Sequence, residues 1–129
     1  MLNPVASEAG DDGGSILETG LVHPQPDVTL LTAAGEIDTL TVPRLADALD
    51  RLVTGDDPVL VADLSEVSFL ASGGLAALIQ AAHRAADSGR TLRLVVANRA
   101  VRRPLEITGT DQLFDLHTDR AAAMAKVHD

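Results

Sequence analysis

Apolar residues in this chain fall into short runs that alternate with longer segments in which they recur every three or four positions. The short runs predict β-strands, because strands covered on both faces have few polar positions. The expected strands are 16–22, 28–34, 59–64, 91–97 and 112–117. The segments with helical spacing predict amphipathic α-helices. The expected helices are 41–54, 72–87, 101–107 and 120–127.

Strands and helices that alternate at these lengths favour an α/β fold with a mixed, largely parallel sheet of four to five strands and about four helices. Residues 1–15 include three glycines and two consecutive aspartates but few large apolar side chains, which predicts a disordered tail. Residues 16–127 are therefore expected to form one domain, as the total length of 129 residues allows.

Particular residues at the segment ends set these boundaries. Thr41 and Asp119 are expected to be N-caps, whose side-chain oxygens accept hydrogen bonds from the first amides of the following helix. Gly109 is expected to stop the helix before it. Pro24 and Pro26 are expected to end the first strand, because proline has no backbone N–H to donate.

The net charge of −9 at pH 7 limits the partners that the chain can bind. Ten Lys and Arg residues do not provide the basic face that nucleic acid or an anionic membrane requires. The absence of cysteine excludes disulfides and thiolate metal sites, and two aromatic residues, Phe69 and Phe114, leave an aliphatic core. Since neither a leader peptide nor an apolar run of about 20 residues is visible, a soluble cytoplasmic protein is expected.

The segment 67–78, VSFLASGGLAAL, joins a predicted strand to a predicted helix and carries the most distinctive pattern. A helix start with Gly73 and Gly74 in its first turn exposes backbone amides at the positive end of the helix dipole. Such a start holds a phosphate or offers a smooth surface to another protein, so a docking or switch site is favoured over a catalytic one. Ser72 is either a phosphoacceptor there or an N-cap that bonds the amide of Gly74 or Leu75.

Other polar residues do not form a catalytic or metal-binding pattern. Asp63 is expected to end a strand and Glu66 to lie in a turn, so solvated or turn-bonding roles are favoured over acid–base chemistry. The four histidines lack the spacing of metal ligands, and neither a metal nor a cofactor is expected. A small basic spot is either a solvated helix end or a contact for an acidic partner. It consists of Arg99, Arg102 and Arg103.

Three segments together resemble the STAS domain, the fold of anti-sigma-factor antagonists. The first is LTAAGEID at 31–38, similar to a strand that ends in Gly-Glu-(Leu/Ile)-Asp. The second is VADLSEVSFL-ASGGL at 61–75, similar to Asp-Leu-Ser-x-Val-x-Phe-(Leu/Met)-Asp-Ser-(Ser/Thr)-Gly-Leu. The third is LEITG at 105–109, followed by Leu113 and Phe114. The segments occur in the order of the family, and the resemblance covers residues 16–127.

The resemblance implies a binding protein without enzymatic activity: an anti-sigma factor antagonist that regulates sigma-factor-dependent transcription. The implied partner is an anti-sigma factor with a histidine-kinase-like ATPase fold. In the family, this kinase phosphorylates the Ser or Thr immediately before the loop glycine, and the unmodified antagonist captures it. The oligomeric state is left open between a monomer and a weak dimer. The implied partner-binding residues are Asp38, Thr39, Ala71, Ser72, Gly73, Gly74 and Leu75.

This chain departs from the family pattern at two positions of the loop. Ala71 stands where the family has an aspartate, and Gly73 stands at the phosphoacceptor position, where it offers no oxygen. Ser72, one place earlier, still carries a hydroxyl, so binding is expected to be either unregulated by the kinase or controlled through Ser72. Asp38 either belongs to the kinase-facing patch or forms an Asx-turn or cap beside Thr41. Thr39 is favoured as a solvated loop residue.

A second function is compatible with the same fold. Some solitary STAS domains are accessory subunits of lipid-transporting ABC ATPases, with a loop that reads Asp-Thr-Ala-Gly-Leu. In that loop a hydroxyl occupies the place of Ser72, and a small residue occupies the place of Gly73. A phosphoryl-accepting receiver is disfavoured, because it requires a lysine beside clustered carboxylates and the one lysine here, Lys126, lies in the last predicted helix.

Overall fold

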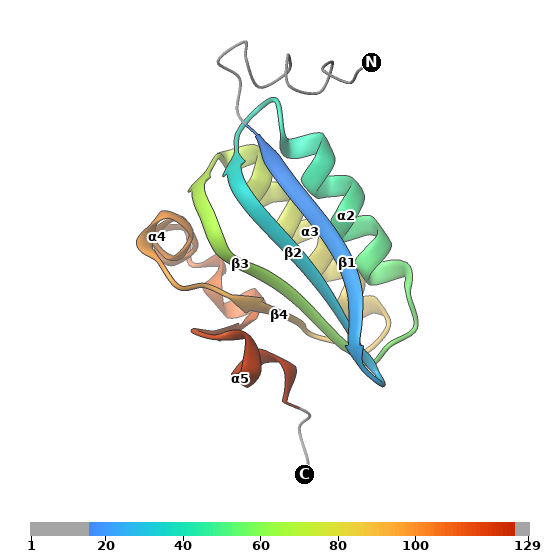
Figure 1. The fold of residues 1–129 in the computed structure, drawn as a ribbon. Coiled ribbons are helices and arrows are strands. Elements are labelled where there is room, and N and C mark those ends of the chain that lie inside the picture. The colour runs from blue at the N-terminus through green and yellow to red at the C-terminus, as the bar shows by residue number, and fades with distance from the viewer. Residues whose placement is uncertain (1–15, 126–129) are drawn as a thin grey trace, which may run out of the picture.

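The computed structural model describes residues 16–125, which form one five-stranded sheet and the helices packed on it (Figure 1). The strands are β1 (Leu17–Gln25), β2 (Val28–Ile37), β3 (Val59–Leu70), β4 (Leu92–Val95) and β5 (Asp115–His117). The helices are α2 (Val42–Thr54), α3 (Ser72–Asp87), α4 (Arg99–Thr108), the 3₁₀ helix η1 (Thr110–Leu113) and α5 (Arg120–Met124). The expected tail, 1–15, and the last two residues of the expected domain, 126–127, lie outside the described residues.

The strands lie in the sheet in chain order, β1-β2-β3-β4-β5. β1 and β2 form an antiparallel hairpin, while β2, β3, β4 and β5 run parallel. The helices α2 and α3 lie side by side behind the sheet in Figure 1, and α5 lies in front of it. The expected α/β fold with a mixed, largely parallel sheet is confirmed.

Two apolar clusters cover the two faces of this sheet. The larger cluster fills the space between the sheet and helices α2, α3 and α4, and it is aliphatic apart from Phe114. The smaller cluster lies between the sheet and α5 and consists of Val28, Leu30, Val59, Val61, Val95 and Ala123. Because α5 is short, it covers only part of its face, and the part of β1, β2 and β3 beyond it stays open in Figure 1.

Three strands are longer than the sequence pattern predicts: β1, β3 and β2, which runs to Ile37. β3 continues to Leu70, beyond the expected end at residue 64, because its second half pairs with β2. This pairing contains two register shifts, one between Thr32 and Ala34 and one between Gly35 and Glu36. β1 runs through Pro24 to Gln25, so the expected end at this proline is wrong. Its position at the edge of the sheet explains the difference, since an edge strand tolerates a missing N–H on its outer side.

The other boundaries differ by a few residues at most. β4 and β5 are shorter than expected, and α4 begins at Arg99, ahead of the expected start. Gly109 ends α4 in the left-handed conformation, with φ of 73°. The Asp119 carboxylate caps α5 by accepting the N–H of Ala122 at 2.8 Å. The end of α4 and the cap of α5 are therefore confirmed.

Gly35 brings the start of β1 against the end of β2. Its φ is 125°, and a Cβ at this position would lie 2.1 Å from the Ile16 carbonyl oxygen. That same oxygen accepts the N–H of Glu36 at 3.1 Å. Glycine is required here for both reasons, and it fixes the path of β2 toward the loop that follows.

Candidate partner-binding site

The junction of β3 and α3 forms a corner at one edge of the sheet. Here "the corner" means residues 71–74. Ala71 has an extended backbone, with φ of −79° and ψ of 162°, and the helix begins at Ser72. Ser72 and Gly73 are exposed, Ala71 is half-buried, and Gly74 is buried. Leu75, expected to contact a partner, is 8% exposed and belongs to the core, so among residues 71–75 the accessible surface comes mainly from Ser72 and Gly73.

Ser72 is not the N-cap of α3. The cap position falls on Ala71, whose carbonyl oxygen accepts the N–H groups of Gly74 and Leu75 at 2.9 and 3.1 Å. Ser72 is already helical, so its side chain lies past the position from which a cap reaches the first amides. Its exposed hydroxyl forms no hydrogen bond with residues 16–125. The hydroxyl is therefore available to an external group.

The two glycines of the corner have different roles. A Cβ on Gly74 would lie 2.3 Å from Cγ2 of Ile37 and 2.9 Å from Cδ1 of Leu70, so the helix packs against the sheet through this glycine. A Cβ on Gly73 would lie 3.4 Å from Cγ2 of Val42, which is an ordinary contact. Gly74 is thus needed for packing, whereas Gly73 leaves the exposed surface smooth.

The loop between β2 and α2, residues 38–41, is stabilised by its own polar side chains. Asp38 forms an Asx-turn, because its Oδ1 accepts the N–H groups of Leu40 and Thr41 at 2.9 and 3.1 Å. The Thr41 hydroxyl donates to the Glu36 carbonyl at 2.7 Å and accepts the Asp38 N–H at 2.9 Å. Thr41 lies at the cap position of α2 but makes no side-chain cap bond, so its expected capping role is wrong. The hydroxyl fastens the loop to β2 instead.

This loop and the corner lie next to each other at the edge where β2 and β3 end. The Ala71 N–H donates to the Ile37 carbonyl at 2.7 Å, and Gly73 faces Val42 at the start of α2. Parallel strands end at the same edge of a sheet, which explains why loops 33 residues apart in sequence meet here. Thr39 is exposed, as expected, and Leu40 is 74% exposed. Leu40 is not among the surface residues that the sequence pattern predicts.

Asp63 forms a buried ion pair that the sequence pattern does not predict. It lies within β3 at 4% exposure, and its Oδ2 accepts Nε and Nη2 of Arg120 at 2.8 and 2.7 Å. Burial raises the pKa of the Asp63 carboxyl, but the bonds from Ser65 and Arg120 outweigh that effect and hold the pKa below its usual value. The expectation of a solvated carboxyl is therefore wrong, whereas the alternative, a local bond to the backbone, is present, because Asp63 Oδ1 accepts the Ser65 N–H at 3.0 Å. Glu66 is exposed, and it too lies in β3 rather than in a turn.

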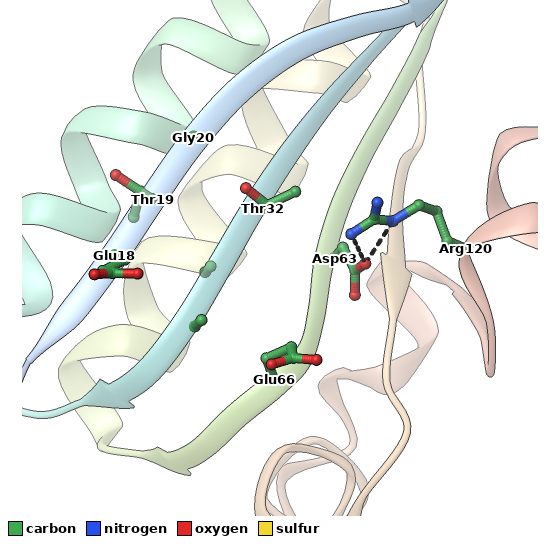
Figure 2. Close-up of a pocket in the computed structure, with 9 residues that line it drawn as sticks. Glu18, Thr19, Gly20, Thr32, Asp63, Glu66 and Arg120 are labelled. Carbon is green, nitrogen blue, oxygen red and sulfur yellow. Dashed lines mark hydrogen bonds and ion pairs between the residues drawn. The ribbon is translucent and has the colours of Figure 1, made fainter.

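The ion pair borders a hollow of about 320 Å³ on the open part of the sheet (Figure 2). Figure 2 shows the Arg120 guanidinium reaching from α5 to Asp63, with Glu66 on the same strand and Glu18 and Thr32 across the sheet. The arginine neutralises the buried carboxylate. The hollow is thus built around a structural ion pair, and the side chains of Glu18 and Glu66 also line it.

Neither a metal centre nor a membrane span emerges from the described part of the chain. Within residues 16–125, no group of three or more His, Asp or Glu side chains is placed to hold a metal ion. His83 is exposed on α3, as expected from its place on the polar side of that helix. No helix in the same range is long and apolar enough to cross a membrane. The corner and the adjacent loop are the candidate site.

Comparison with known proteins agrees with this fold. The family model of the STAS domain matches residues 21–123, and the chain belongs to this family. The anti-sigma-F factor antagonist RsfB of Mycobacterium tuberculosis is 33% identical over 100 residues, which are 78% of this chain and 81% of the relative. An anti-sigma-B factor antagonist of Listeria monocytogenes is 32% identical over 83 residues, which are 64% of this chain and 73% of the relative.

Solved structures of anti-sigma factor antagonists have a similar fold. An anti-sigma factor antagonist from Mycobacterium paratuberculosis has a TM-score of 0.73 and 31% identity, with 84% of this chain and 92% of that chain covered. The unphosphorylated form of SpoIIAA, also an anti-sigma factor antagonist, has a TM-score of 0.63 and 11% identity, with 81% of this chain and 92% of that chain covered. At that identity SpoIIAA supports the fold alone.

Proposed function

We propose that this protein is an anti-sigma factor antagonist, which binds an anti-sigma factor and thereby regulates sigma-factor-dependent transcription. Relatives with this function at 31–33% identity support the proposal. The observation that carries it is the adjacency of the corner to the loop 38–41, with Ser72, Gly73, Thr39 and Leu40 all exposed at one edge of the sheet. Such a protein acts by binding rather than by catalysis, in the cytoplasm, where bacterial transcription takes place.

The proposed partner is an anti-sigma factor of the serine-kinase type, with a histidine-kinase-like ATPase fold. The resemblance to the family supports this choice, and the departures in the loop modify it. Gly73 has no oxygen to receive a phosphoryl group, and Ala71 removes the acidic side chain beside it. The partner therefore either binds without phosphorylating the protein or transfers phosphate to Ser72.

The geometry of Ser72 fits the second possibility. Its hydroxyl is exposed and makes no hydrogen bond within the described residues, so a kinase reaches it without disrupting a cap. A phosphate at the first turn of α3 would gain from the helix dipole, so the fold would tolerate it. The same charge, about −1.5 to −2, would alter the complementarity of a surface otherwise made of small side chains. Phosphorylation would then release the partner.

Binding to purified anti-sigma factors from the source organism, measured by titration calorimetry, tests the proposed function. Gly73→Arg places a bulky side chain at the exposed corner and is expected to weaken binding roughly tenfold or more. Gly55→Arg is the matched control, because Gly55 is exposed at the far end of α2. If the wild-type chain binds none of these factors, or if both variants weaken binding equally, the proposal is wrong.

Incubation with the kinase and ATP, followed by intact-mass measurement, tests the assignment to Ser72. One added phosphoryl group that disappears in Ser72→Ala supports control through this residue. No added mass supports the unregulated form. Phosphate that persists in Ser72→Ala would refute the assignment to Ser72.

A second function is proposed as the alternative: an accessory subunit of an ABC-type lipid transport ATPase. The loop favours it, because a hydroxyl at Ser72 followed by the small residue Gly73 matches the pattern of such subunits. A pull-down with the tagged protein distinguishes the two functions. Retention of an ABC ATPase supports the accessory subunit, and retention of an anti-sigma factor supports the antagonist.

A further inference from the structure

An apolar groove lies between the end of β3 and helix α4, which are neighbours in Figure 1. Phe69 at the end of β3 is 50% exposed, and Ile107 on α4 is 68% exposed. The hollow has a volume of about 410 Å³. Its principal lining residues are Phe69, Leu70, Arg99, Arg103, Pro104 and Ile107. Two large apolar side chains exposed beside one hollow are typical of a binding surface.

Two arginines border this groove, and their charges are not compensated within the described residues. Arg99, Arg103 and Ile107 follow one another at intervals of four residues, so they share one face of α4. The guanidinium groups of Arg99 and Arg103 form no hydrogen bond or ion pair with residues 16–125. Arg102, on another face of the helix, differs, because it pairs with Glu106 and donates to the Val96 carbonyl at 3.3 Å.

The groove thus combines an apolar floor with two cations at its rim, in a chain whose net charge is −9. A complementary ligand carries apolar side chains beside carboxylates. A second copy bound through the same groove would place Arg99 and Arg103 against their own symmetry mates, which like-charge repulsion disfavours. Nucleic acid offers anions but is opposed by the overall negative charge. A protein segment that is both apolar and acidic is the occupant that fits.

We propose that this groove is a second docking site for the anti-sigma factor, and that it receives an amphipathic, carboxylate-bearing segment of that partner. The inference rests on the proposed function, because it assigns a further contact to the same partner. Position supports it: Leu70 lines the groove and directly precedes Ala71, the first residue of the corner. A partner seated on the corner therefore has the groove beside it.

Binding of the anti-sigma factor to the full chain and to matched pairs of variants tests this proposal. In the groove, Ile107→Ser removes an exposed apolar side chain, and Val22→Ser on β1 is its control, at 48% exposure. Likewise, Arg103→Glu reverses a charge in the groove, and Arg51→Glu on α2 is its control. Each groove variant is expected to raise Kd roughly five- to fiftyfold, and each control less than about twofold.

The dependence on salt adds a second readout. The effect of Arg103→Glu should shrink as ionic strength rises, whereas the effect of Ile107→Ser should persist, because salt screens exposed charges and leaves apolar contacts intact. Thermal unfolding of all four variants checks that each is folded at the temperature of the binding assay. An effect of Arg103→Glu that shrinks with salt, together with an effect of Ile107→Ser that persists, would support the groove as a docking site for an acidic, apolar segment.

Three results would overturn the proposal, and they are distinguishable. If the groove variants bind like wild type while Gly73→Arg does not, the groove is not a docking site and the proposed function stands. If the wild-type chain binds no anti-sigma factor, the proposed function fails and the groove contact fails with it. If Ile107→Ser instead abolishes self-association seen by sedimentation and leaves partner binding unchanged, the occupant of the groove is a second copy of the chain.

Discussion

Arg120 of α5 and Asp63 of β3 form an ion pair that connects the last described helix to the middle of the sheet. Asp63 is 4% exposed, whereas half of the Arg120 side chain is accessible to solvent. Arg120→Ala would leave the buried carboxylate without its cation. We expect a loss of about 1–3 kcal/mol in the free energy of unfolding, less than for a fully buried pair because of this exposure. Urea denaturation measures the loss.

Arg84→Ala is the control for this prediction. Its partner is Asp50, and both side chains are close to half exposed. Such a pair contributes less than about 1 kcal/mol. An equal loss in the two variants would mean that burial of Asp63 does not strengthen its pair.

The stability of the protein should fall at acidic pH, in part through Asp63. Because its pKa in the folded state lies below the usual value, the pair contributes stability above the pKa of the unfolded chain, about 3.9. That contribution is lost as pH falls from there through the folded-state pKa. Compared with the wild-type protein, Asp63→Asn should be less stable at neutral pH and should lose less stability on acidification. Urea denaturation at several pH values from about 6 to 2.5 measures both differences. Parallel pH profiles would contradict the prediction.

Gly74 and Gly73 should respond in opposite ways to the same substitution. Gly74→Ala would force a methyl group against Ile37 and Leu70, and we expect a loss of about 1–3 kcal/mol in stability. Gly73→Ala meets ordinary contact distance and gains helix propensity, so stability should stay constant or rise by up to about 1 kcal/mol. Thermal unfolding compares the two. A loss in both variants would show that the whole corner is tightly packed.

Thr41 should be essential for the shape of the loop 38–41. Thr41 is 7% exposed, and its hydroxyl bonds both the Glu36 carbonyl and the Asp38 N–H. Thr41→Val keeps the volume of the side chain but removes this hydroxyl. The unsatisfied polar groups should cost about 1–3 kcal/mol. Thr39→Val, at an exposed position in the same loop, should change stability by less than about 0.5 kcal/mol. Chemical denaturation measures the stability of both variants. An equal loss in both would mean that the Thr41 hydroxyl has no special role in stabilising the loop.

The elements of the fold were largely predictable because their apolar patterns are local. The helix 72–87 was predicted with the bounds that the structure has, since small and apolar residues recur along one face until Ser88 and Gly89 end it. The second half of β3 was not predictable in the same way. Ser65 and Glu66 have the composition of a turn, and only their pairing with β2 keeps them in the strand.

The candidate site was predicted in outline, and its details depend on tertiary contacts. The resemblance to the family placed the corner and Asp38 together, and the structure brings them to one edge. Ser72 is a residue type that often caps helices, but the N-cap position of α3 falls one residue earlier, on Ala71. The partner of Asp63 lies 57 residues away along the chain, so no local pattern indicates it. The groove beside α4 likewise depends on two distant segments.

The order of the strands also bears on how the protein is made. Each strand from β2 to β5 pairs with the one that precedes it, so the template for a new strand has already left the ribosome when that strand emerges. The sheet can thus grow in the direction of translation. Arg120 is the exception, because the nascent domain holds the carboxylate of Asp63 uncompensated until α5 has been synthesised. The ion pair of Asp63 therefore forms only after Arg120, near the end of the described chain, has been synthesised.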